Sequence, residues 1–100
     1  MKIQFNTDKT INGDEKQQEY YTTMIADELD RFKSQITRIE VHLSDENGND
    51  MKCLLEARLE GMQAIAVSCQ ADTVEQAVSG AIDKLKTSLE TIIGRLGKHT

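Results

Sequence analysis

The chain has 100 residues, of which 38% are apolar, and a formal net charge of -5. This length and composition predict a single domain, residues 1–100, with one modest hydrophobic core. The negative charge argues against indiscriminate attraction to nucleic acid or acidic lipid, because the long-range field of the protein repels polyanions. No apolar run approaches the length of a membrane span and the first residues lack a secretion signal, so we expect a cytoplasmic location and no membrane partner.

The first two elements are predicted from the spacing of apolar residues. Residues 2–7 alternate polar and apolar side chains, which is the period of a short strand with one buried face. After the turn signal Asn12-Gly13, Asp14 can cap a helix whose acidic first turn complements the helix dipole. The inner face of this helix is expected to carry Tyr21, Ile25, Leu29 and Phe32.

Three further segments are predicted to be strands. Residues 36–43, 51–60 and 64–70 alternate in the same way, and the polar loop at 44–50 contains the hairpin signal Asn47-Gly48. The side chains expected to point into the core are Ile39, Val41, Leu43, Cys53, Leu55, Ala57, Leu59, Ile65, Val67 and Cys69.

The turn between the last two strands determines how they pair. A two-residue loop would direct the apolar residues of the last strand toward solvent, since directly opposed residues share a face. We therefore predict a three-residue connection, residues 61–63, which pairs Leu59 with Ile65. In this register Cys69 is only diagonal to Cys53, which is a poor geometry for a disulfide.

Residues 72–98 have the spacing of a long amphipathic helix. Lys84 and Arg95 lie only about 20° apart around its axis, with Lys98 close by, so one flank of the helix is cationic. Glu90 is expected on the outer side, away from that flank. The apolar stripe, at steps of three and four, contains Val74, Val78, Ala81, Ile82, Leu85, Leu89, Ile92 and Leu96.

Basic side chains of this helix, and of the end of the first helix and the turn after it, form the candidate anion-binding surface. The alternative is an ordinary solvated face, which the pattern alone favours. The seven residues are Lys84, Lys86, Arg95, Lys98, Arg31, Lys33 and Arg38.

The order of elements is β-α-β-β-β-α. A strand, a crossover helix and a strand favour a parallel unit, and the following hairpins extend the sheet in antiparallel fashion. We therefore predict an α+β fold, in which two helices pack on one face of a four-stranded mixed sheet. The other face stays open and carries side chains of both charges.

No constellation of residues supports catalysis. His42 is predicted on the open face of the sheet and both cysteines on the buried face, which excludes a nucleophilic triad and a zinc site built from these residues. Phosphate-binding glycine loops are also missing, because Gly80, Gly94 and Gly97 lie within a helix rather than after a strand. The protein is therefore expected to be no enzyme and to use no cofactor, metal or small-molecule substrate.

Several local strings coincide with a known family. These are MKIQF at residues 1–5, RFKSQITRIEVHL at 31–43 and, most specifically, AVSGAIDKL at 77–85. With the order of elements, they make the chain resemble the ribosome hibernation promoting factors and related ribosome-associated inhibitors. This resemblance implies the same β-α-β-β-β-α fold, which is similar in shape to double-stranded RNA-binding domains. It also implies binding to ribosomal RNA of the small subunit, where messenger and transfer RNA would sit, and inhibition of translation in idle or stressed cells.

The chain departs from this family where short members are rich in Lys and Arg. Thr87, Thr91 and Ile93 occupy the matching positions. The chain also stops soon after the last helix, so we expect a short-type, acidic relative without the additional domain of long members. A protein-interaction module that has lost RNA binding but kept the fold is the alternative. The sequence leaves open whether the protein is a monomer or a weak dimer.

Overall fold

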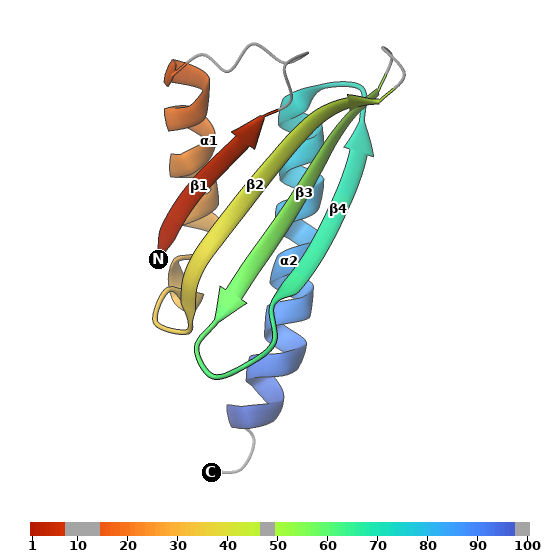
Figure 1. Ribbon diagram of the computed structural model, residues 1–100. Helices are drawn as coiled ribbons and strands as arrows, with labels where there is room; N and C mark the ends of the chain where they lie inside the picture. Colours follow the sequence, from red (N-terminus) through yellow and green to blue (C-terminus); the bar gives the residue numbers. More distant parts are fainter. Residues whose placement is uncertain (8–14, 47–49, 98–100) are drawn as a thin grey trace.

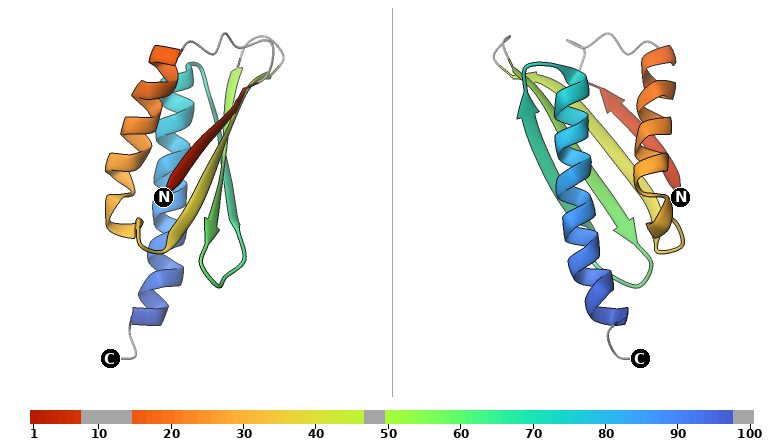
Figure 2. Two further views of the ribbon diagram at one scale, coloured as in Figure 1. Left: turned by 60° about the vertical axis from the view of Figure 1, so that its left-hand side comes forward. Right: turned by 180° about the vertical axis from the view of Figure 1, so that it is seen from behind.

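The computed structural model describes residues 1–7, 15–46 and 50–97 of the chain as a four-stranded sheet with two long helices on one of its faces (Figures 1 and 2). The predicted element order and α+β class are confirmed, with a short 3-10 helix added after the first helix. The elements are β1 (Lys2–Thr7), α1 (Glu15–Glu28), η1 (Asp30–Phe32), β2 (Ile36–Glu46), β3 (Asp50–Leu59), β4 (Ile65–Ala71) and α2 (Val74–Gly97).

The sheet has the strand order β1-β2-β3-β4. Strands β1 and β2 are parallel, whereas β2 with β3 and β3 with β4 are antiparallel, as predicted. The parallel pair requires a crossover, and α1 provides it. Helix α2 returns along β3 and β4, so the two helices lie side by side on the same face of the sheet, in front of it in the right-hand view of Figure 2.

The core lies between the helices and the covered face of the sheet. The predicted inner face of the first helix is confirmed, since Tyr21, Ile25, Leu29 and Phe32 are at most 7% exposed. Helix α2 contributes Ala77, Val78, Ala81, Ile82, Leu85 and Leu89, and β3 contributes Cys53, Leu55, Ala57 and Leu59. None of the polar or charged residues that the structure describes is buried with them.

Helix α2 begins where a threonine satisfies its free amide groups. The Thr73 hydroxyl oxygen accepts a hydrogen bond of 3.1 Å from the Gln76 amide, and the Thr73 carbonyl accepts one of 3.0 Å from the Ala77 amide. These are the contacts of an N-terminal cap. The cap predicted at Asp14 and the turn signals at residues 12–13 and 47–48 lie outside the described residues.

The predicted register between β3 and β4 is wrong by two residues. The structure pairs Ala57, not Leu59, with Ile65, and it places Cys69 directly opposite Cys53. The connection is therefore residues 60–64, five residues rather than three.

The cause of the longer connection lies in β2. Leu59 pairs with Ile36 of β2, and the Glu60 amide donates a hydrogen bond of 3.0 Å to the Gln35 carbonyl. The end of β3 is thus held by β2 alone, and the chain then turns through Gly61, whose φ of 71° favours glycine. A shift of two residues keeps every side chain on its predicted face.

A pair of substitutions in β4 tests the assignment of its faces. Val67 is half-buried and packs against the core, whereas its neighbour Ala66 is exposed. We expect Val67→Asp to lower the free energy of unfolding by about 2–3 kcal/mol, because it places a charge without a partner on the core side. Ala66→Asp should change it by no more than about 0.5 kcal/mol. Urea denaturation measures both, and equal losses would contradict the assignment.

Candidate nucleic-acid interface

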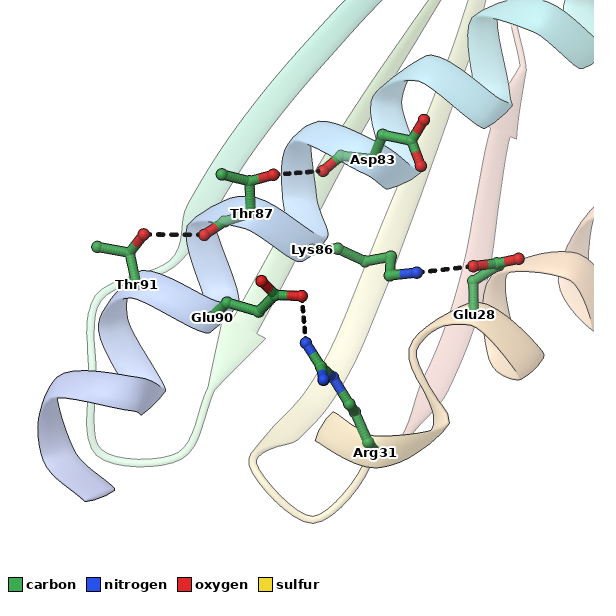
Figure 3. A network of polar contacts seen from close by, with 7 residues as sticks. All are labelled: Glu28, Arg31, Asp83, Lys86, Thr87, Glu90 and Thr91. Atoms are coloured by element: carbon green, nitrogen blue, oxygen red, sulfur yellow. Dashed lines mark hydrogen bonds and ion pairs between the residues drawn. The ribbon is translucent and has the colours of Figure 1, made fainter. Parts of the chain in front are cut away.

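Two ion pairs connect the end of the first helical segment to α2. The Lys86 ammonium lies 2.9 Å from a carboxylate oxygen of Glu28, and the Arg31 guanidinium contacts the carboxylate of Glu90 (Figure 3). Glu28 ends α1 and Arg31 lies in η1, while the two partners are four residues apart on one side of α2. We call these four residues the helix seam.

The helix seam is open to solvent. The Arg31 and Glu90 side chains are 60% and 52% exposed, and those of Lys86 and Glu28 are 31% and 49% exposed. The Arg31 guanidinium also lies 4.6 Å from the centre of the Phe32 ring, and burial of Phe32 in the core anchors this stacking. A shallow depression of about 410 Å³ next to the seam is lined by Arg31, Phe32, Gln35, Glu90 and Ile93.

The electrostatic balance at the helix seam is neutral. Lys33, the other predicted basic residue here, lies 3.5 Å from the Asp30 carboxylate. Each of the three cations in this region therefore has a carboxylate partner. Glu90 lies away from the flank of Lys84, as predicted, but its pairing with Arg31 and the pairing of Glu28 with Lys86 were not predicted from the sequence. The four-residue spacing of Lys86 and Glu90 was a signal that both lie on one side of the helix.

Lys84 lies on the other flank of α2. Its ammonium donates a hydrogen bond of 2.8 Å to the Ser68 carbonyl of the edge strand β4. Residues two apart in a helix are separated by about 200° around its axis, so Lys84 and Lys86 cannot share one face. The structure therefore divides the predicted cationic surface between two flanks of α2.

The outer surface of α2 between these flanks carries hydroxyl groups instead of cations. The Thr87 hydroxyl donates to the Asp83 carbonyl at 3.1 Å, and the Thr91 hydroxyl donates to the Thr87 carbonyl at 3.0 Å (Figure 3). These bonds hold both hydroxyls against their own helix. The positions at which the family resemblance implies Lys or Arg therefore present short, neutral side chains.

Arg38 lies on the opposite side of the molecule. Its neighbour Ile39 faces the core, so Arg38 faces the open surface of the sheet, directly between Lys2 of β1 and Arg58 of β3. Glu40 and Glu56 pair with the two arginines at 3.6 Å and 3.2 Å. Alternation in the sequence predicts that all three residues lie on the open face, but it does not show that they form one row across the strands.

The remaining two predicted residues are at the end of the chain. Arg95 belongs to α2, but its side chain is outside the described part of the structure, as is the whole of Lys98. Of the seven predicted basic residues, the structure thus brings Arg31 and Lys86 together at the helix seam, and Lys33 pairs with Asp30 two residues along the chain from Arg31. The structure places Lys84 and Arg38 on two other surfaces.

His42 and the two cysteines do not come together in the described part of the structure. No three His, Cys, Asp or Glu side chains among the described residues are grouped so that they could hold a metal ion. Cys53 is fully buried on the helix side of the sheet, whereas His42 faces the open side. In the part of the chain that the structure describes, no helix is long and apolar enough to cross a membrane.

The structure is that of an α+β domain with two helices on one face of a four-stranded mixed sheet. Its family follows from comparison with known sequences. The family model described as Sigma 54 modulation protein / S30EA ribosomal protein matches residues 4–96. The chain therefore belongs to this family. A comparison with the curated proteins found no match.

Solved structures share the fold. The N-terminal domain of Protein Y from Thermus thermophilus superposes with a TM-score of 0.78 at 20% sequence identity, covering 92% of this chain and 99% of that one. A ribosomal subunit interface protein from Coxiella burnetii gives 0.75 at 20% identity, covering 94% of this chain and 99% of that one. At this level of identity the two similarities establish the fold alone.

Proposed function

We propose that the protein binds the small ribosomal subunit through phosphates of ribosomal RNA and thereby inhibits translation in idle or stressed cells. Membership of a ribosome-associated family supports this proposal. The observation that carries it is the helix seam, where Arg31 and Lys86 are held at the surface by carboxylates that phosphates can replace. A cytoplasmic location follows from such a partner.

The exchange of carboxylate for phosphate is energetically feasible. Solvent-exposed ion pairs contribute only about 0.2–1 kcal/mol each, so opening the two pairs of the seam costs little. Phosphate oxygens then provide charge-assisted hydrogen bonds, and an arginine can make two in parallel. Lys84 adds a cation on the other flank of α2, Lys33 adds one beside η1, and the sequence supplies Arg95 and Lys98 as two further candidates.

The second candidate is a protein-interaction module on the same fold that has lost ribosomal RNA binding. The neutral balance of the seam and the hydroxyl row at Thr87 and Thr91 favour it. In this case, the open sheet face or an edge strand would contact a protein partner. The two candidates differ in how they respond to salt.

Co-sedimentation with isolated small subunits at about 50 and 200 mM salt tests the proposal. Each neutralised phosphate releases counterions, so about three to six contacts weaken binding by about 40-fold or more over this range. The same protein should inhibit cell-free translation at the lower salt. Absence of binding at low salt would refute the function, and binding that does not respond to salt would favour the interaction module.

A further inference from the structure

Two free cysteines face each other across β3 and β4, beneath helix α2. Cys53 and Cys69 are directly opposed in the antiparallel ladder. Directly opposed residues have Cα atoms about 4.5–5.5 Å apart. A disulfide requires about 4.4–6.8 Å between Cα atoms. The two strands are therefore already at the spacing that a bond between these cysteines needs.

The two thiols differ in accessibility. Cys53 is 0% exposed in the centre of the sheet, whereas Cys69 lies on the edge strand and is only partly buried. Burial, and secondarily the neighbouring Cys69, raises the pKa of the Cys53 thiol to about 12. Cys53 is therefore protonated in the reduced protein and out of reach of solutes, and a small solute reaches Cys69 first.

The Cys69 sulfur also supports α2. A Cβ atom added to Gly80 would lie 2.4 Å from this sulfur and 3.3 Å from the Cys69 Cβ, so the helix backbone rests directly on the cysteine. One residue before Cys69, the Ser68 carbonyl accepts the hydrogen bond from Lys84. The position of the Cys69 sulfur is thus coupled to the packing of α2 on the edge strand.

We propose that Cys53 and Cys69 form a dithiol site that hydroperoxides oxidise to an intramolecular disulfide. In the first step the Cys69 sulfur attacks the O–O bond, which breaks, and gains one oxygen as a sulfenic acid while the peroxide leaves as an alcohol or water. In the second step the S–O bond of the sulfenic acid breaks as the Cys53 sulfur bonds to the Cys69 sulfur, and the departing hydroxide takes the Cys53 proton in the same step, so that one water is released. Two thiols and one peroxide give one disulfide, water and the reduced peroxide.

Formation of this disulfide changes how α2 packs on the edge strand β4. It turns the Cys69 sulfur away from Gly80 and toward β3, which removes the contact on which the helix backbone rests. The site is built from β3, β4 and α2 alone, so it stands whether or not the protein binds ribosomes.

Peroxide oxidation of the native full-length chain tests this inference. The protein is treated with hydrogen peroxide, quenched with acid, alkylated and analysed by mass spectrometry. We expect a monomer that has lost two hydrogen atoms, with both alkylation sites disappearing at the same rate. Trypsin cuts after Lys52 and Arg58, so the two cysteines fall on separate peptides that remain linked only through a disulfide.

Three results would overturn the inference. They are a Cys69 sulfinic acid beside a Cys53 that still alkylates, a disulfide-linked dimer, and no oxidation of the folded chain under conditions that oxidise it in urea. In a Cys53→Ser variant, a sulfenic acid trap should label Cys69, because the resolving thiol is gone. Absence of that label in a folded variant would also count against the inference. If the Cys53→Ser variant does not fold, the tryptic peptides of the peroxide-treated native chain still show whether Cys53 and Cys69 are linked.

Discussion

Replacing Lys84, Arg95 and Lys98 with Glu should abolish co-sedimentation with the small ribosomal subunit. Each reversal removes a phosphate contact and adds a repulsive charge, and loss of about three contacts removes most of the electrostatic free energy of binding. None of the three belongs to the apolar stripe predicted from the sequence, so the domain should remain folded. Circular dichroism checks the fold, and sedimentation at low salt measures the binding.

A matched variant shows whether the loss of binding depends on where the reversed charges lie or only on the net charge of the protein. Replacing Lys2, Lys52 and Arg58 with Glu on the open sheet face also takes the net charge from -5 to -11, since each reversal changes it by two. We expect this control to bind the small subunit more weakly than the native protein does, with binding that is still detectable at low salt. Equal loss in both variants would mean that overall charge, not the α2 flank, governs binding. The interaction module predicts the reverse pattern, with the open-face variant alone losing its partner.

The faces of the strands and helices could be predicted because burial follows a short period in the sequence. Alternation in β3 placed Cys53, Leu55, Ala57 and Leu59 on the core side, and all four are at most 6% exposed. Steps of three and four did the same for five residues of α2 that are at most 2% exposed, Val78, Ala81, Ile82, Leu85 and Leu89. Val74 and Ile92, at the two ends of the predicted stripe, are half-buried, and the side chain of Leu96 lies outside the described residues. These patterns are local, and they predict the same buried face for any tertiary arrangement that covers one side of the strand or helix.

The β3–β4 register could not be predicted from the same pattern. Two registers that differ by two residues bury the same side chains, so the hydrophobic pattern does not distinguish them. What distinguishes them is the pairing of Leu59 with Ile36 and the hydrogen bond from Glu60 to Gln35, both of which depend on β2. The direct opposition of Cys53 and Cys69 follows from this long-range constraint and was therefore missed.

Only the cations of the candidate site could be predicted from the sequence. Helical spacing identified Lys86 on α2, and its partner Glu28 lies 58 residues away on α1. Arg31 and Glu90 are separated in the same way, by 59 residues. The pairing of acids with bases depends on how the two helices pack side by side on the sheet. Local sequence patterns do not determine that packing.

Replacing Glu28 and Glu90 with Gln should strengthen binding to the small subunit. In the native protein, these carboxylates occupy Arg31 and Lys86 and compete with phosphate for them. Each exposed ion pair is worth about 0.2–1 kcal/mol, so releasing both cations should lower the dissociation constant by about 2- to 30-fold. Glutamine keeps the length of the side chain and its ability to accept a hydrogen bond, which limits the effect on the fold.

The control for this prediction lies on the other face of the sheet. Replacing Glu40 and Glu56 with Gln changes the net charge by the same amount and releases Arg38 and Arg58 from equivalent ion pairs. Titration of both double variants against small subunits at fixed salt measures the difference between them. A larger gain for the Glu28 and Glu90 variant places the ribosomal RNA at the helix seam, because only there do the freed cations meet phosphates. Equal gains would show that net charge alone sets the affinity. No gain in either variant would mean that the seam does not contact RNA.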